Sequence, residues 1–223
     1  MNWILRLAAI IISICLTCIS HIYIYRRGVE KEDVTVRKLK TYLFSPKIIV
    51  TSIICIFLSI LLFYMSDYYG HTIMESYKCL IVFLWMVPIA LIDKKEQAIP
   101  NILSLFGLGF WSCLLLLEWQ IAKVPLKTSL LFSLFGMLLG GGVFLICALI
   151  LKGSVGMGDV KLFSLLGMFY GFTGLFSILF VSLILLGIVS IFLLIVKKAD
   201  KKSVLPMAPF ALIGFIISIM LGV

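Results

Sequence analysis

The sequence predicts an all-α, polytopic membrane protein with about eight transmembrane helices. Of its 223 residues, 63% are hydrophobic and only 13% are charged, whereas a soluble domain carries about 25% charged residues. The mean hydropathy is +1.23. Apolar segments recur at lengths near the roughly 20 residues that a helix needs to cross a bilayer core of about 30 Å. These observations exclude secreted disulfide scaffolds, disordered binders and ordinary cytosolic enzymes.

Eight apolar segments are the expected spans. The apolar run after Arg6 extends to Tyr25, ends in Arg26 and Arg27 and shows no small-residue cleavage site, so we interpret the first segment as a retained anchor and not a signal peptide. The sixth segment ends where Thr173 and Gly174 break the apolar run, and its boundary with the seventh is the least distinct. The expected spans cover residues 3–25, 47–66, 79–92, 101–117, 128–151, 160–172, 174–196 and 204–223.

The distribution of basic residues predicts the orientation of these spans. If the N-terminus faces outward, 15 of the 19 Lys and Arg residues lie in inner loops, and only Arg6, Lys78, Lys123 and Lys127 lie outside. Inner loops of membrane proteins carry such an excess of positive charge. We therefore expect an N-out, C-out multi-pass protein of the cell membrane. The net charge of +9 then reflects topology, and no nucleic-acid partner is predicted.

The chain divides into two parts by this pattern. Residues 1–78 form a helix pair joined by a short basic loop, residues 26–46, on the cytoplasmic side. Residues 79–223 form a core of six helices. The loop is too short to bury a hydrophobic core of its own, and its positive charge makes the lipid bilayer its expected partner. The chain shows no internal repeat of the kind that many transporters contain.

Two of the ten acidic residues stand out, because ionisable groups at membrane depth are costly and mark functional sites. The other acids, Asp67 and Glu75 among them, are expected in loops or at an outer helix end. Asp93 follows an apolar run of 14 residues and Asp159 precedes one of 13. Runs of about 21 Å fall short of a 30 Å core, so both acids are expected to be recessed from the inner face. An alternative, in which tilted helices leave both acids in wet loops, stays open.

The neighbours of the two acids strengthen the first interpretation. Three glycines, Gly153, Gly156 and Gly158, precede Asp159 within six residues and allow the backbone to fold closely around the carboxylate. Pro100 lies seven residues after Asp93 and separates one helix from the next. Two carboxyl groups within hydrogen-bonding reach share one proton, so that one activates water while the other polarises a peptide carbonyl. Aspartic-protease chemistry is the predicted activity.

Competing chemistries find few residues to support them. The two histidines, His21 and His71, fall on opposite faces of this topology, so no serine or cysteine triad is expected. The six cysteines form no pair of CxxC motifs, and we expect no metal site and no cofactor. Two other classes stay open: a proton-coupled transporter that uses the same two aspartates, and an inactive membrane scaffold.

Three motifs resemble those of the type IV prepilin peptidases, a family of GxGD-type membrane aspartic peptidases. Residues 156–162, Gly-Met-Gly-Asp-Val-Lys-Leu, are similar to the GxGD motif, and Asp93 followed by Pro100 and Asn101 is similar to the first aspartate motif. Residues 205–210, Leu-Pro-Met-Ala-Pro-Phe, are similar to a Pro-x-x-Pro element near the C-terminus of the family.

The resemblance implies an eight-helix endopeptidase that removes a short basic leader from prepilins or pseudopilins at the cytoplasmic membrane face. Asp93 and Asp159 would be its catalytic pair, and Gly156, Gly158, Pro100 and Asn101 would shape the site. Lys161 would either tune Asp159 or anchor the helix at the inner face. Many bacterial members carry two CxxC pairs in a longer first loop, associated with zinc binding and N-methylation. Residues 26–46 contain no cysteine, so the sequence favours the peptidase activity alone.

Overall fold

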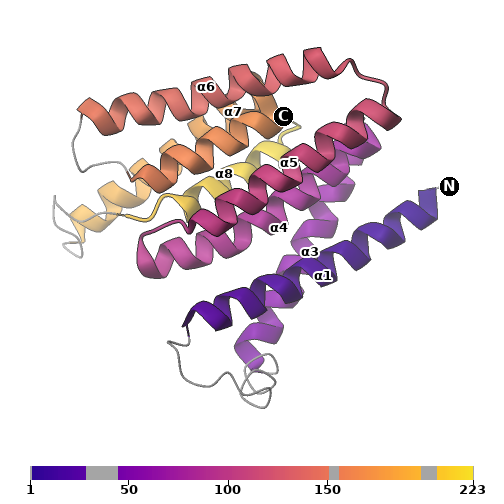
Figure 1. Ribbon diagram of the computed structural model, residues 1–223. Helices are drawn as coiled ribbons and strands as arrows, with labels where there is room; N and C mark the ends of the chain where they lie inside the picture. The colour runs from indigo at the N-terminus through magenta and orange to yellow at the C-terminus, as the bar shows by residue number, and fades with distance from the viewer. Residues whose placement is uncertain (1, 29–44, 151–155, 197–204, 223) are drawn as a thin grey trace. The chain divides into compact units, whose positions relative to one another are not determined.

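A computed structural model describes residues 2–28, 45–150, 156–196 and 205–222. Every regular element in these ranges is an α-helix. The helices, shown in Figure 1, are α1 (Asn2–Gly28), α3 (Pro46–Tyr68), α4 (Ile73–Glu96), α5 (Asn101–Ile121), α6 (Leu126–Ile150), α7 (Met157–Ile195) and α8 (Ala208–Met220). Six of them are long and apolar enough to cross a membrane, and α8 is a shorter apolar helix. The predicted class, an all-α membrane protein, is confirmed.

Several predicted features fall outside the described residues. They include most of the basic loop, residues 29–44, and the basic residues Lys152, Lys197, Lys198, Lys201 and Lys202. The inward orientation of the positive charge and the count of eight spans therefore stay predictions.

Helix α7 contains two helical segments, because the chain reverses inside it. Gly171 has φ 62° and ψ −157°, a conformation outside the helical region that glycine adopts most easily. A Cβ placed on Gly140 of α6 would lie 2.8 Å from the carbonyl carbon of Phe163 and 2.9 Å from Leu175 Cδ2. Twelve residues of straight helix would separate these residues by about 18 Å. The second segment therefore folds back beside the first, three residues before the break expected at Gly174.

The reversal frees a backbone carbonyl, and two side chains satisfy it. Ser133 Oγ of α6 donates a hydrogen bond to the carbonyl oxygen of Met168 at 2.8 Å. Trp111 Nε1 of α5 donates to the same oxygen at 3.1 Å and to Ser133 Oγ at 3.1 Å. An unpaired carbonyl inside a bilayer would cost several kcal/mol. The tryptophan of α5 and the serine of α6 therefore stabilise the bend of α7.

Helices α6 and α8 pack against α7 (Figure 1). Phe144 of α6 stacks on Phe163 of α7, with ring centroids 4.4 Å apart. Ser177 and Ser218 share a hydrogen bond of 3.0 Å between α7 and α8. The chain divides into two compact units, Met1–Pro88 and Ile89–Val223, and all these contacts belong to the second.

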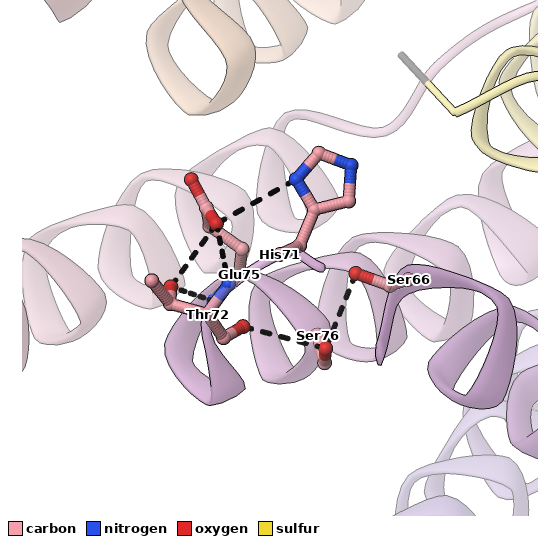
Figure 2. Close-up of polar contacts among 5 residues, drawn as sticks. All are labelled: Ser66, His71, Thr72, Glu75 and Ser76. Carbon is pink, nitrogen blue, oxygen red and sulfur yellow. Dashed lines mark hydrogen bonds and ion pairs between the residues drawn. The ribbon is translucent and has the colours of Figure 1, made fainter. Parts of the chain in front are cut away.

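Small polar side chains join the helices of the first unit. Ser59 Oγ of α3 donates to Ser13 Oγ of α1 at 3.0 Å, and both serines are fully buried. Ser76 Oγ of α4 donates to Ser66 Oγ of α3 at 3.2 Å (Figure 2). Small and hydroxyl-bearing residues are typical of helix interfaces in membranes because they let backbones approach closely.

A capping box starts α4 six residues earlier than the apolar run predicts. The amide of Thr72 donates to Glu75 Oε2 at 2.8 Å, and the amide of Glu75 donates to Thr72 Oγ1 at 3.3 Å (Figure 2). This reciprocal pair satisfies two amides at the helix start. The expected span 79–92 is too short at both ends, and the expectation of a loop at Glu75 is wrong. Asp67, also expected in a loop, lies inside α3.

Replacing Thr72 by alanine is expected to destabilise the protein by about 1 kcal/mol, because the capping hydroxyl is lost. A protein of this size then unfolds about 2–4 °C lower. Thermal unfolding followed by circular dichroism in detergent measures the shift. The control is Thr72→Ser, which keeps the hydroxyl. If the serine and alanine variants unfold at the same temperature, the capping box does not stabilise α4.

Candidate active site

Asp93 lies in the last turn of α4, and the start of α8 covers it. Its side chain is 5% exposed. Asp93 Oδ2 accepts a hydrogen bond of 2.9 Å from the backbone N–H of Ala208, the first residue of α8. The amide of Met207 interacts with the same carboxyl group. Asp93 is therefore buried under the start of α8, while its depth relative to the inner membrane face stays a prediction.

Asp159 lies in the first turn of α7, as the glycine pattern predicts. Gly156 is the N-cap residue in an extended conformation, and its carbonyl oxygen accepts a hydrogen bond of 3.0 Å from the amide of Asp159. A Cβ on Gly156 would lie 3.4 Å from Asp159 Oδ2. The absence of a side chain at position 156 therefore leaves one side of the carboxyl group uncovered.

The connection between α4 and α5 contacts the start of α7. Gln97 ends α4 in a left-handed conformation, with φ 49°, and its amide donates to the carbonyl oxygen of Asp93 at 2.9 Å. A Cβ on Gly158 would lie 3.0 Å from Ile99 Cβ and 3.3 Å from the Ile99 amide nitrogen. Only glycine allows this approach without displacing Ile99. Gly158 therefore lets the start of α7, which carries Asp159, pack closely against the connection that follows Asp93.

A polar contact reinforces this junction. Lys161 Nζ donates a hydrogen bond of 2.7 Å to Asn101 Oδ1, between α7 and α5, and both side chains are exposed. Pro100 is the N-cap residue of α5, which agrees with its predicted place between two helices. All seven residues proposed from the sequence for this site thus lie around the ends of α4, α5 and α7.

The carboxyl groups of Asp93 and Asp159 interact electrostatically, although 66 residues separate them in the chain. The described residues contain no group of three or more His, Cys, Asp or Glu side chains that could hold a metal ion. Two carboxyl groups that repel each other when both are charged favour a state with one proton between them. Such a pair can act as general base and general acid on one substrate.

Sequence reasoning missed two contributors to this site. The amide of Ala208 holds Asp93, and Ile99 packs on Gly158. Neither position carries a chemical group that a motif search would select, because one contributes its backbone and the other an alkyl side chain. The Pro-x-x-Pro segment drew attention to residues 206–209 only by resemblance, without a role for the amide.

Comparisons with known proteins identify sequence relatives of this chain. The type IV leader peptidase family matches residues 80–191, which are 112 of the 223 residues. A prepilin leader peptidase/N-methyltransferase of Pseudomonas putida is 28% identical over 138 residues, covering 61% of this chain and 47% of the relative. A protein with the same name from Bacillus subtilis is 28% identical over 149 residues, covering 67% of this chain and 57% of the relative.

The chain spans about half the length of these curated relatives. No solved structure shows a significant match. The matched range includes both aspartates and all of the helix ends around them except the start of α8. On this match, the chain belongs to the type IV leader peptidase family.

Proposed function

We propose that this protein is a membrane aspartic endopeptidase that removes the leader peptide from type IV prepilins or pseudopilins. The observation that carries the proposal is the close packing of the segment after Asp93 on the start of α7, which carries Asp159, so that the two carboxyl groups interact electrostatically. Membership of the leader peptidase family supports the substrate class, and so do the names of the two relatives. The same names favour peptidase activity over proton-coupled transport.

The proposed reaction uses both carboxyl groups without a covalent intermediate. The ionised aspartate takes a proton from water, whose oxygen bonds to the carbonyl carbon of the scissile peptide. The protonated aspartate hydrogen-bonds the carbonyl oxygen and stabilises the developing gem-diol. A proton then passes to the leaving nitrogen and the C–N bond breaks. The products are a leader with a free carboxylate and a mature pilin with a free amine.

The surroundings of the pair suit this reaction. Burial of Asp93 limits access of bulk water on one side, while the bare backbone at Gly156 leaves room beside Asp159 for a peptide strand. The described residues place both acids at helix ends and not at the middle of long helices. This supports a site at one membrane face, which the distribution of basic residues predicts to be the cytoplasmic one.

Cleavage of a prepilin tests the proposal directly. The purified chain in detergent or nanodiscs is incubated with full-length type IV prepilins and pseudopilins, and the products are identified by intact-mass spectrometry. We expect loss of the leader and a mature N-terminus with an unmodified amine, even with a methyl donor present. If no prepilin or pseudopilin is shortened, the proposed substrate class is wrong. A methylated product would contradict the expectation of peptidase activity alone.

A further inference from the structure

We infer that the start of α8 is a positioning element for Asp93, and that the backbone amide of Ala208 acts on catalysis through this carboxyl group. The inference rests on the proposed function, in which Asp93 belongs to the catalytic pair. It assigns a role to the Pro-x-x-Pro segment, residues 206–209, whose side chains offer no catalytic group.

The first step is that Asp93 serves as the N-terminal cap of α8. A helix leaves its first amides without partners inside the helix. The N-cap residue of α8, Met207, provides no side-chain hydrogen bond to them. The Asp93 carboxylate accepts the Ala208 amide at 2.9 Å, and a negative charge at a helix N-terminus is stabilised by the helix dipole. An acid of α4 therefore does what a local Ser or Asp usually does.

The second step is that the segment is stiff. Pro206 and Pro209 restrict the backbone on both sides of the Met207–Ala208 pair, because each proline ring fixes its own φ and constrains the residue before it. Pro209 also has no N–H of its own. Met207 and Ala208 are both buried, with Ala208 only 1% exposed. The two prolines thus stiffen the flanks of a buried pair of residues, which limits how far the Ala208 amide can move away from Asp93.

The third step is that α8 packs on both segments of α7. A Cβ on Gly214 of α8 would overlap Ser182 Oγ and lie 2.9 Å from the carbonyl oxygen of Ile178, both in the segment after Gly171. The rings of Phe215 and of Tyr170, which ends the segment that carries Asp159, lie edge to face with centroids 5.6 Å apart. Because α8 holds Asp93 and α7 holds α8, the two aspartates are positioned by one packed body and not by the α4–α5 connection alone.

Replacing the amide by an ester isolates this contact. The α-hydroxy analogue of alanine at position 208 removes the N–H and keeps the side chain. The matched control is the same replacement at Ala211, which is fully buried and donates to the carbonyl oxygen of Met207 at 3.0 Å. Both esters weaken the hydrogen bond from the Ala211 amide to the Met207 carbonyl oxygen. The ester at 208 makes the Met207 carbonyl a weaker acceptor, and the ester at 211 removes the donor N–H. Of the two, only the ester at 208 removes an amide that donates to Asp93.

The expected result is a kinetic difference between the two esters. A hydrogen bond to a charged group corresponds to a factor of about 10 to 150. We expect kcat for leader cleavage to fall by about 10- to 150-fold with the ester at 208, with KM within about twofold of the unmodified chain. The ester at 211 should lower kcat by less than about threefold. Equal losses from both esters, or an unchanged kcat with the ester at 208, would overturn the inference.

A second measurement does not depend on cleavage. In the Asp93→Leu background, the Ala208 amide has lost this acceptor, so the ester at 208 should lower the unfolding temperature by much less than it does in the unmodified chain. The ester at 211 should lower it by the same amount in both backgrounds. The absence of this coupling would show that Asp93 does not cap α8. Coupling in a chain that cleaves no prepilin would support the capping of α8 by Asp93 and overturn only the proposed function.

Discussion

Replacing either Asp93 or Asp159 by asparagine is expected to lower kcat for leader cleavage by roughly 10²–10⁴-fold. Asparagine has the same shape but neither donates nor accepts a proton at neutral pH, so each variant removes one of the two roles. In the Asp93→Asn variant, the side-chain amide oxygen can still accept the Ala208 amide, so the start of α8 keeps its partner. The loss should therefore appear in kcat with little change in the unfolding temperature.

The double variant separates a shared catalytic unit from two independent contributions. When two catalytic groups act as a unit, removing one of them already abolishes most of the contribution of both. The double variant with Asp93→Asn and Asp159→Asn should therefore be about as slow as either single variant. The matched control is Asp67→Asn, the same substitution at an exposed acid of α3, which should leave kcat unchanged. Initial rates from quantitative mass spectrometry measure all four. Full activity in either single variant would exclude the pair as the catalytic centre.

Replacing Gly136 of α6 by alanine is expected to destabilise the protein by about 3 kcal/mol, the upper end of the usual cost of overpacking. The new Cβ would overlap the carbonyl oxygen of Gly167 and lie 2.7 Å from its carbonyl carbon and 2.8 Å from Gly171 Cα. These are backbone atoms of α7, which cannot rotate away as a side chain can. Relief requires α6 and α7 to separate, which removes packing around the bend. A shift of about 6–12 °C in the unfolding temperature follows.

The same helix offers the control for this prediction. A Cβ added to Gly142 of α6 would meet no atom within 4 Å, so Gly142→Ala should be neutral or stabilise the helix by about 0.5–1 kcal/mol. Gly167→Ala should behave like Gly136→Ala, because its Cβ would overlap the carbonyl oxygen of Gly136. Thermal unfolding by circular dichroism compares the three. Equal stability of Gly136→Ala and Gly142→Ala would mean that α6 and α7 are not in backbone contact.

The membrane class and the helix-forming segments follow from local patterns, because hydropathy over about 20 residues reports directly on burial in a bilayer. Helix ends are less predictable. The start of α4 depends on a capping box in a polar segment, outside the apolar run that predicts the span. The bend of α7 is at Gly171 and not at Gly174, because the choice depends on which glycine meets α6 and which carbonyl Ser133 and Trp111 can satisfy.

At the candidate site, too, some features can be predicted from the sequence and others depend on contacts between remote residues. Asp93 and Asp159 can be selected from the sequence because acids are rare beside apolar segments, and Gly156 and Gly158 because glycine clusters allow close backbone approach. The role of Gly158 depends on Ile99, which lies 59 residues earlier in the chain. The contact of Lys161 with Asn101 is equally remote in sequence, so no local pattern predicts it.

The identity of the two acids, their flanking glycines and the membrane setting are thus properties of the sequence, since each is carried by neighbouring residues. The electrostatic interaction between the acids, the burial of Asp93 and its hydrogen bond with the Ala208 amide depend on how α4, α7 and α8 pack. The physical reason is that a backbone amide is the same at every non-proline residue, so its direction, and therefore its role at the site, exists only in the folded chain.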